Sequence, residues 1–245
     1  KIRKLIAGFW MAQLIRNLRR LDKFVVLSYE DKQKWHELAN VSVIYNPIAR
    51  YPEVISDCSS KKVISAGRFE NQKGFDMLIK SWSIVSKRYP DWNLEIYGSG
   101  DKSSYNKLVE ENNIGNSCML MEAVQNLNEK FTESSIFAFS SRFEGFGMVI
   151  TEAMACGLPP VAFACPCGPR DIIEDGVNGL LAEPGNIEDL ANKLSLLMED
   201  SEMRKEMGKQ ARVRSERFSI EIIAVEWDEL FHSLTEVKSN VRHSS

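Results

Sequence analysis

Features that mark several other protein classes are missing from this chain of 245 residues. No apolar run reaches the roughly 18 residues that a membrane-spanning helix needs. The formal net charge of -3 provides no basic excess, which argues against nucleic-acid binding. The five cysteines form no C-x-x-C pair, and Cys165 and Cys167 have no histidine beside them, so a zinc site is not expected. This cysteine usage favours reduced thiols and a cytoplasmic location.

Histidines and acidic metal-binding motifs are also scarce. His36, His232 and His243 have no acidic partner at a useful spacing, so none is predicted to act as a general base. No D-x-D motif is present, so a diphosphate bridged to the protein by a metal ion is not expected. The chain starts without methionine or a signal-peptide cleavage pattern, and its first residues are already helical in pattern. We therefore expect it to be part of a longer protein.

The first 20 residues combine a helical apolar stripe with positive charge and no acidic residue. The stripe consists of Leu5, Ile6, Phe9, Trp10, Leu14, Ile15 and Leu18, and the cations are Lys1, Arg3, Lys4, Arg16, Arg19 and Arg20. One interpretation is a helix lying on an anionic membrane surface at the cytoplasmic face. The other is a helix packed on a sheet with a solvated basic face. The second is favoured because any amphipathic core helix shows such a stripe.

The segment after this helix shows no extended periodicity of apolar residues. The elements predicted there are strands at 24–28 and 41–45, a helix at 32–38 and an irregular linker over 48–61. Asn46-Pro47 is expected to end regular structure before the linker.

From residue 62 onward, short apolar strands alternate with amphipathic helices. The predicted strands are 63–66, 94–97, 119–121, 136–139, 161–164 and 179–182. The predicted helices are 74–88, 103–112, 128–134, 147–156, 169–174, 187–199, 201–216 and 219–236, before a frayed tail at 239–245. This alternation predicts an α/β fold with a Rossmann-like parallel sheet and helices on both faces. Ligands of such sheets bind at the carboxyl ends of the strands, near a switch point.

A glycine-flanked basic loop follows the strand predicted at 63–66. Gly67 permits a tight strand exit, and Gly74 lets the next helix begin close to a ligand. Arg68 offers a planar fork for phosphate oxygens and Lys73 a compact positive charge, so the two cations could converge on one diphosphate. The alternative is a pair of solvated surface cations. The diphosphate is favoured because the loop stands at the carboxyl end of a parallel strand.

A second loop, between the strand predicted at 136–139 and the next helix, carries two carboxylates around glycines. Gly145 and Gly147 leave backbone N–H groups accessible to a pyrophosphate. Glu152 is a candidate acceptor for two ribose hydroxyls, and Glu144 could bind hydroxyls of a transferred sugar. Alternatively, Glu152 caps or pairs within its helix and Glu144 lies on the surface.

Two further strand exits carry weaker signals. Tyr97-Gly98-Ser99-Gly100-Asp101 lacks the third glycine of G-x-G-x-x-G, so we expect a turn beside the ligand and no NAD site. The segment at Met121–Gln125 could support a base ring near Val124, although ordinary loop packing explains it equally well.

These motifs, in this order, resemble the nucleotide-sugar half of glycosyltransferase family 4, whose members are retaining enzymes with the GT-B fold. Glu144 and Glu152 meet the E-x7-E spacing, and the blocks A-M-A-C-G-L-P at 153–159 and G-P-R-D-I-I-E-D-G-V-N-G-L-L at 168–181 are similar to the family's. The resemblance covers about residues 60–200. Residues 21–47 look like the end of an N-terminal domain, and Pro159-Pro160 replaces the family's usual single proline.

The resemblance implies a role for each matching residue. Residues implied to bind the donor are Gly67, Arg68, Lys73, Val124, Glu144, Gly145, Phe146, Gly147, Met148 and Glu152. Arg68 and Lys73 would neutralise the departing diphosphate and Glu144 would hold the sugar, which makes these three the residues implied to act in catalysis. The implied donor is a UDP-sugar, the acceptor a glycan or lipid-linked glycan, and no metal or cofactor is implied.

The implied domain organisation leaves the acceptor half incomplete. Residues 1–48 would be a remnant of the acceptor domain and the start of the linker, 49–218 the donor-binding domain, and 219–245 a C-terminal helix and tail. The missing N-terminal part would provide any peripheral contact with the cytoplasmic face of the inner membrane. Because transfer in this fold occurs between two domains, this chain could bind donor without completing transfer alone. A stand-alone nucleotide-sugar-binding module and a UDP-sugar epimerase remain alternatives.

Overall fold

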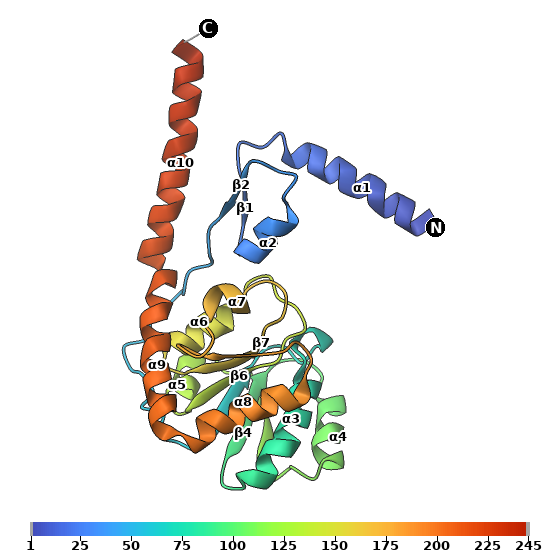
Figure 1. Ribbon diagram of the computed structural model, residues 1–245, viewed down its shortest axis with the longest axis vertical. Helices are drawn as coiled ribbons and strands as arrows, with labels where there is room; N and C mark the ends of the chain where they lie inside the picture. Colours follow the sequence, from blue (N-terminus) through green and yellow to red (C-terminus); the bar gives the residue numbers. More distant parts are fainter. Residues whose placement is uncertain (1, 244–245) are drawn as a thin grey trace.

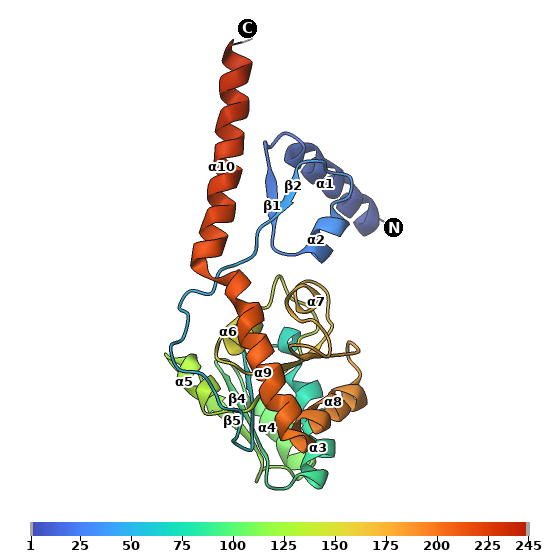
Figure 2. The same ribbon diagram turned by 60° about the vertical axis from the view of Figure 1, so that its left-hand side comes forward.

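The computed structural model describes the backbone of residues 2–243 and the side chains of residues 8–236. Its elements form a small N-terminal segment and a larger α/β domain, and the last helix rises from the domain past the segment (Figures 1 and 2). The larger part contains the predicted strand and helix alternation.

The α/β domain is built on a six-stranded sheet in which every neighbouring pair is parallel. Its strands are β3 (Lys62–Ala66), β4 (Asn93–Gly98), β5 (Cys118–Glu122), β6 (Ile136–Phe139), β7 (Pro160–Phe163) and β8 (Leu180–Ala182). Their spatial order is β5-β4-β3-β6-β7-β8, so the order reverses between β3 and β6. All six predicted strands are present, and the predicted parallel sheet is confirmed.

Helices cover both faces of this sheet. One face packs against α3 (Phe75–Arg88), α4 (Ser103–Glu111) and α8 (Ile187–Glu199). The other packs against α5 (Leu127–Thr132), α6 (Met148–Ala155) and α7 (Pro169–Ile172). Helix α9 (Ser201–Ser215) packs on α6 and α8, and two short 3-10 turns, η1 (Asn71–Lys73) and η2 (Glu216–Phe218), precede α3 and α10.

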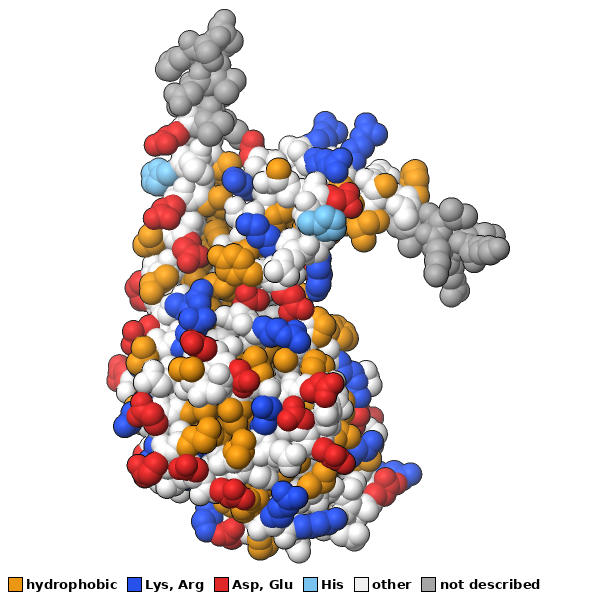
Figure 3. Space-filling model, viewed as in Figure 1, with side chains coloured by type: hydrophobic (Ala, Val, Ile, Leu, Met, Phe, Trp, Pro, Cys, Tyr) orange, Lys and Arg blue, Asp and Glu red, His pale blue; other side chains and the backbone are white. Residues whose placement is uncertain are grey.

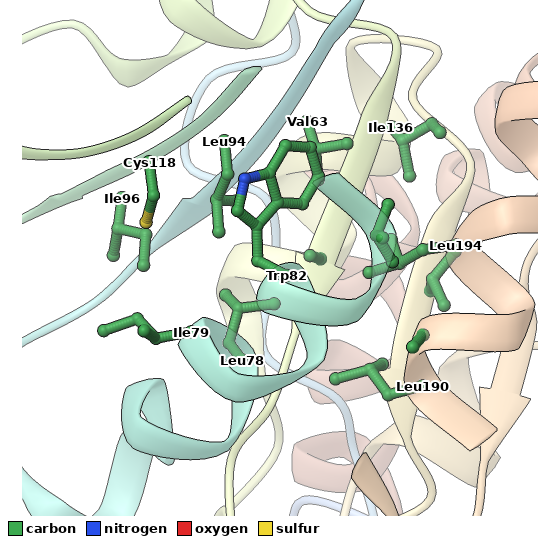
Figure 4. Close-up of a cluster of buried hydrophobic side chains, with 14 of the residues drawn as sticks. Val63, Leu78, Ile79, Trp82, Leu94, Ile96, Cys118, Ile136, Leu190 and Leu194 are labelled. Carbon is green, nitrogen blue, oxygen red and sulfur yellow. The ribbon is translucent and has the colours of Figure 1, made fainter. Parts of the chain in front are cut away.

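Alternating side chains along β3 explain the two layers. Val63 and Ile64 are both fully buried but belong to different apolar clusters, because successive strand residues point to opposite faces. On the first face, Trp82 of α3 points toward the strands and is fully buried (Figure 4). Its indole N–H donates to the Ser117 hydroxyl at 3.1 Å, so burial leaves this polar group satisfied.

The N-terminal segment contains two parallel strands and two helices. Its elements are α1 (Ile2–Leu18), β1 (Phe24–Val26), α2 (Tyr29–Lys34) and β2 (Val41–Val43). Helix α2 begins three residues before the start predicted at 32, because the Ser28 hydroxyl accepts the N–H of Asp31 and caps the helix there.

Helix α1 packs through its C-terminal end. Ile15 and Leu18 contact the β1–β2 cluster, whereas Phe9 and Trp10 are 66% and 63% exposed. The favoured interpretation, a helix packed on a sheet, therefore holds for the end next to β1. The predicted stripe and cation positions at 1–6 lie outside the described side chains. Within the described chain, no helix is both long and apolar enough to cross a bilayer.

The linker after β2 connects the segment with the α/β domain, and α10 (Ile220–His243) leaves the domain near the start of that linker. They meet where the N–H of Ile48 donates to the Phe218 carbonyl at 2.7 Å and Ile48 pairs with Ser219 in an isolated parallel bridge. Helix α10 is longer than the helix predicted over 219–236. The tail predicted to fray is therefore helical up to His243, and residues 244 and 245 lie outside the described part.

Candidate functional site

The reversal of strand order places two candidate loops beside each other. One follows β3 and the other follows β6, the two strands between which the order reverses. In open α/β sheets, the crevice outside the carboxyl ends of such strands is the usual ligand site. Two adjoining cavities of about 500 Å³ and about 230 Å³ lie there and share Ala66, Gly67 and Leu127.

All ten predicted binding residues line one or both of these cavities. The larger cavity is lined by Gly67, Lys73, Glu144, Gly145, Phe146, Gly147, Met148 and Glu152, and the smaller by Gly67, Arg68 and Val124. These ten residues come from three segments, which follow β3, β5 and β6. We call the two cavities together the double cavity.

Lys73 and Glu144 form an ion pair in the larger cavity. The Lys73 ammonium is 2.7 Å from Glu144 Oε1, and the two side chains are only 17% and 9% exposed. The Ser141 hydroxyl donates to the same oxygen at 2.7 Å. The backbone N–H of Glu144 donates to the Pro166 carbonyl at 3.1 Å, so both the backbone and the side chain of Glu144 are held in place.

Arg68 and Lys73 lie in different cavities and do not share a partner. Arg68 is exposed and pairs with Glu70 at 3.1 Å, beside the smaller cavity. Lys73 is held by Glu144 in the larger one. The two cations therefore border opposite parts of one site, and each already has a carboxylate neighbour.

The loop after β3 approaches the end of β6 too closely for a side chain at its last residue. Gly74 has a left-handed backbone (φ +64°), and a Cβ there would lie 2.0 Å from the Ser140 carbonyl oxygen. The Ser140 hydroxyl donates to the Lys73 carbonyl at 2.9 Å. Glycine at this position thus allows Lys73 to reach Glu144.

An arginine fork joins the same two loops outside the cavity. Both terminal nitrogens of Arg142 donate to the Asp76 carboxylate at 2.8 Å, and one also donates to the Asn71 carbonyl at 2.7 Å. Burial acts to raise the pKa of Asp76, but the hydrogen bonds and charge of Arg142 outweigh it, so the pKa is lowered. Arg142 therefore fixes the loop after β6 to the start of α3.

Helix α6 points its N-terminus into the larger cavity. Gly147 caps it with a left-handed backbone (φ +97°), and Met148 and Val149 in its first turn line the cavity. The N-terminus of a helix carries free N–H groups and partial positive charge, which favour an anion.

Glu152 lies one turn further along α6 and is half-buried. Its carboxylate has no hydrogen-bond or ion-pair partner among the described residues, so it neither caps nor pairs within its helix. Burial raises the pKa of Glu152. An unpartnered carboxylate at a cavity wall is free to accept hydrogen bonds from a ligand.

The smaller cavity is formed where two loops touch. A Cβ on Gly98 would lie 1.9 Å from the Gly67 carbonyl, so only glycine fits at the end of β4. Ser99 lines the cavity beside Val124, which is 40% exposed. The turn predicted at 97–101 thus borders the double cavity.

The sequence did not point to several residues of the cavity walls, among them Leu127, Leu27 and Asn46. Leu127 lines both cavities, and Leu27 and Asn46 line the larger one from the N-terminal segment. Leu27 and Asn46 follow closely on the carboxyl ends of β1 and β2, the positions from which parallel strands present ligands. Their place after two strands could have indicated a ligand site, but strands of three residues are too short for the sequence to predict that they pair in parallel.

Charges of both signs are interspersed on the face of the α/β domain in Figure 3. Among the described residues, no group of three or more His, Cys, Asp or Glu is arranged to hold a metal ion.

Comparison with known proteins identifies one family. The family model for "Glycosyl transferases group 1" matches residues 53–214. An uncharacterized glycosyltransferase of Haemophilus influenzae is 36% identical over 211 residues, which are 84% of this chain and 60% of that protein. The poly(ribitol-phosphate) alpha-N-acetylglucosaminyltransferase of Staphylococcus aureus is 29% identical over 225 residues, 90% of this chain and 46% of that protein. The chain thus spans less than two thirds of either relative.

Solved structures show the same architecture. A crystal structure of a variant of S. aureus TarM, in complex with fondaparinux, alpha-GlcNAc-glycerol and UDP, superimposes with a TM-score of 0.80 at 28% identity. The match covers 90% of this chain and 46% of TarM.

Proposed function

This chain belongs to the group 1 glycosyltransferases and has the fold of the C-terminal half of a GT-B enzyme, and from this premise we propose that it binds the donor in sugar transfer. The proposed enzyme is a retaining, metal-independent member of family 4. It moves a hexosyl-type sugar from a UDP-sugar to a glycan or lipid-linked acceptor in polysaccharide biosynthesis.

The double cavity at the strand-order reversal is the observation that carries this proposal. It combines a helix N-terminus, a cation and an unpartnered carboxylate within one continuous wall. A nucleoside diphosphate sugar needs complementary groups for phosphate and hydroxyls, and this wall contains both kinds. The TarM structure, which contains UDP, supports a uridine nucleotide as the first ligand to test.

Lys73 and the N-terminus of α6 are proposed to hold the diphosphate, with Arg68 approaching from the smaller cavity. Lys73 already contacts Glu144 at 2.7 Å, so an arriving phosphate would share the ammonium with this carboxylate. Negative charge grows on the diphosphate as the bond between its oxygen and the anomeric carbon of the sugar breaks. Fixed cations and amide groups stabilise that charge without reorganising.

Glu144 is proposed to hold a hydroxyl of the transferred sugar, and Glu152 the ribose. Glu144 accepts from Lys73 and Ser141 through Oε1, which leaves Oε2 available for a hydroxyl. Glu152 has two oxygens without described partners and can accept from both ribose hydroxyls. The segment at Val124 is proposed to support the base in the smaller cavity.

Residues 1–48 are proposed to belong to the acceptor half of the enzyme. Leu27 and Asn46 from this segment line the larger cavity, so the donor site already includes residues from outside the α/β domain. The acceptor is proposed to enter on that side, and the enzyme to act in the cytoplasm at the inner face of the membrane.

Titration calorimetry and thermal unfolding with UDP, UDP-sugars, ADP and GDP test this function. At a UDP concentration 100 times Kd, binding contributes about 2.7 kcal/mol of stability. For a chain of this size, this raises Tm by roughly 5–10 °C. The absence of binding by every nucleoside diphosphate would refute the proposal.

A further inference from the structure

A short helix outside the α/β domain contacts the loop that follows β7. Figures 1 and 2 both place α2 over α7 and this loop. We propose that Glu30 of α2 is a positioning residue for residues 144–147, here called the donor loop. It acts through residues 165–168, here called the support loop. The inference rests on the proposed donor site but concerns a residue that no sequence motif singled out.

Glu30 bonds directly to the backbone of the support loop. Its Oε2 accepts the N–H of Cys167 at 2.9 Å, and the same oxygen lies 3.7 Å from a terminal nitrogen of Arg170. The Glu30 side chain is 28% exposed, so water competes only partly for this bond. A carboxylate that accepts a backbone N–H makes a stronger bond than a neutral acceptor does.

Two further contacts fix α2 against the same part of the chain. The N–H of Tyr29 donates to Asp171 Oδ1 at 3.1 Å, and the Lys34 ammonium lies 2.7 Å from the Cys167 sulfur. Successive turns of α2 thus contact the support loop and the start of α7, and Glu30 lies between the two contacts.

The support loop in turn holds both ends of the donor loop. The Pro166 carbonyl accepts the N–H of Glu144 at 3.1 Å. At the other end, Gly168 lies so close to Phe146 that a Cβ on it would be 1.6 Å from the Phe146 carbonyl oxygen. A shift of the support loop therefore moves the backbone of Glu144 and Phe146 together.

Cys167 has a backbone conformation that needs external support. Its φ is +63°, the left-handed region that residues other than glycine, asparagine and aspartate rarely occupy. Surrounding contacts must hold such a residue in place. The bond from Glu30 to the Cys167 N–H is one such contact, and its loss allows the support loop to relax.

The consequence is that donor-loop geometry depends on where the N-terminal segment sits. Glu30 does not line the double cavity, so its effect on donor binding is indirect. When α2 is in place, the N–H of Glu144 is fixed and its carboxylate is presented to Lys73. When α2 moves away, this constraint on the donor loop is removed.

Hydrogen exchange measured by mass spectrometry on the full chain tests whether Glu30 restrains the donor loop. In Glu30→Ala, we expect faster exchange in peptides that cover the donor loop, with unchanged exchange in β3 and β4. Glu30→Gln should show a smaller increase than Glu30→Ala, because its amide oxygen can still accept the Cys167 N–H but without the charge. Glu37→Gln is the matched control, because Glu37 pairs with Arg19 at 3.7 Å on the exposed surface of the same segment.

Donor affinity provides the second readout. Glu30→Ala should bind a UDP-sugar about tenfold more weakly, the loss typical of one charge-assisted hydrogen bond. Glu30→Gln should lose less than Glu30→Ala, and Glu37→Gln should keep wild-type affinity. Wild-type exchange in the donor loop of Glu30→Ala would overturn the inference. Faster exchange throughout the α/β domain of Glu30→Ala would also overturn it, as would a Glu30→Gln variant as impaired as Glu30→Ala. If the wild type binds no nucleoside diphosphate, the proposed function fails, whereas the exchange experiment still decides the role of Glu30.

Discussion

Replacing Glu152 by glutamine should weaken UDP binding and stabilise the ligand-free protein. Both effects follow from the same observation, because the carboxylate is half-buried and has no partner among the described residues. Glutamine has nearly the same shape, so the substitution removes the charge and one acceptor oxygen and leaves no cavity. Among the described residues, no hydrogen-bond donor loses its acceptor through this substitution.

The loss of affinity can be worked out from the hydrogen bonds that the ribose would make. A hydrogen bond to a charged group contributes about 1.5–3 kcal/mol, and glutamine retains one of the two acceptor oxygens. The expected loss is therefore about 2–3 kcal/mol, or roughly 30- to 150-fold in Kd.

The gain in stability has a definite pH dependence. Burial raises the pKa of Glu152 above its ordinary value of 4.5, so the folded state favours the neutral acid. Between the ordinary and the raised pKa, the folded chain binds more protons than the unfolded chain, and stability falls as pH rises. Above the raised pKa, the wild type bears the full cost of a buried charge, which the glutamine variant avoids. The variant should thus have the higher Tm at pH 7, and the difference should vanish below pH 4.5.

Calorimetry with UDP and 2′-deoxy-UDP isolates the contact itself. Removal of the 2′-hydroxyl should weaken binding to the wild type by about tenfold or more and have a clearly smaller effect on the Glu152→Gln variant, whose remaining acceptor is uncharged. If the deoxy analogue loses the same affinity with both proteins, Glu152 does not bind the ribose and the reasoning fails. A variant with lower Tm at pH 7 would contradict the argument from burial.

Three other substitutions test the rest of the site. Lys73→Met should weaken UDP binding about 10- to 100-fold in calorimetry without changing uridine affinity, because the lost charge faces the diphosphate; equal losses for both ligands would contradict this role. Arg142→Ala should lower the free energy of unfolding by about 1–2 kcal/mol in urea titrations at pH 7. This difference should shrink as pH falls through the lowered pKa of Asp76, since protonation breaks the same ion pair; a constant difference would argue against it. Gly74→Ala should cost more than the ~1–2 kcal/mol of a left-handed backbone, because its Cβ also meets a carbonyl oxygen at 2.0 Å; a urea midpoint equal to that of the wild type would refute the close approach.

The periodicity of the sequence predicted the α/β domain because local physics determines most of it. Val63 and Ile64 belong to opposite faces, and the glycine at 74 marks a turn where the backbone must approach another segment. The same loops indicated the candidate site, since they follow strands whose carboxyl ends share one edge. Strand order was not predictable, because it depends on long-range pairing that leaves no mark in short sequence windows.

Pairings between distant side chains could not be predicted. Lys73 and Glu144 are 71 residues apart, and nothing in either loop shows that the cation already has a buried partner. The contact of Glu30 with Cys167 spans 137 residues and depends on how the N-terminal segment sits on the domain. Such contacts depend on the complete fold, whereas a sequence motif shows only which residue types one loop contains.

The bridge between Ile48 and Ser219 joins the start of the linker to the start of α10. The linker is the covalent connection from the N-terminal segment to the α/β domain. If the chain bends at this bridge, the displacement of the segment grows with distance from the bridge, as along a lever. Helix α2 lies away from that point in Figure 1, so a small rotation at the bridge becomes a larger movement over the support loop.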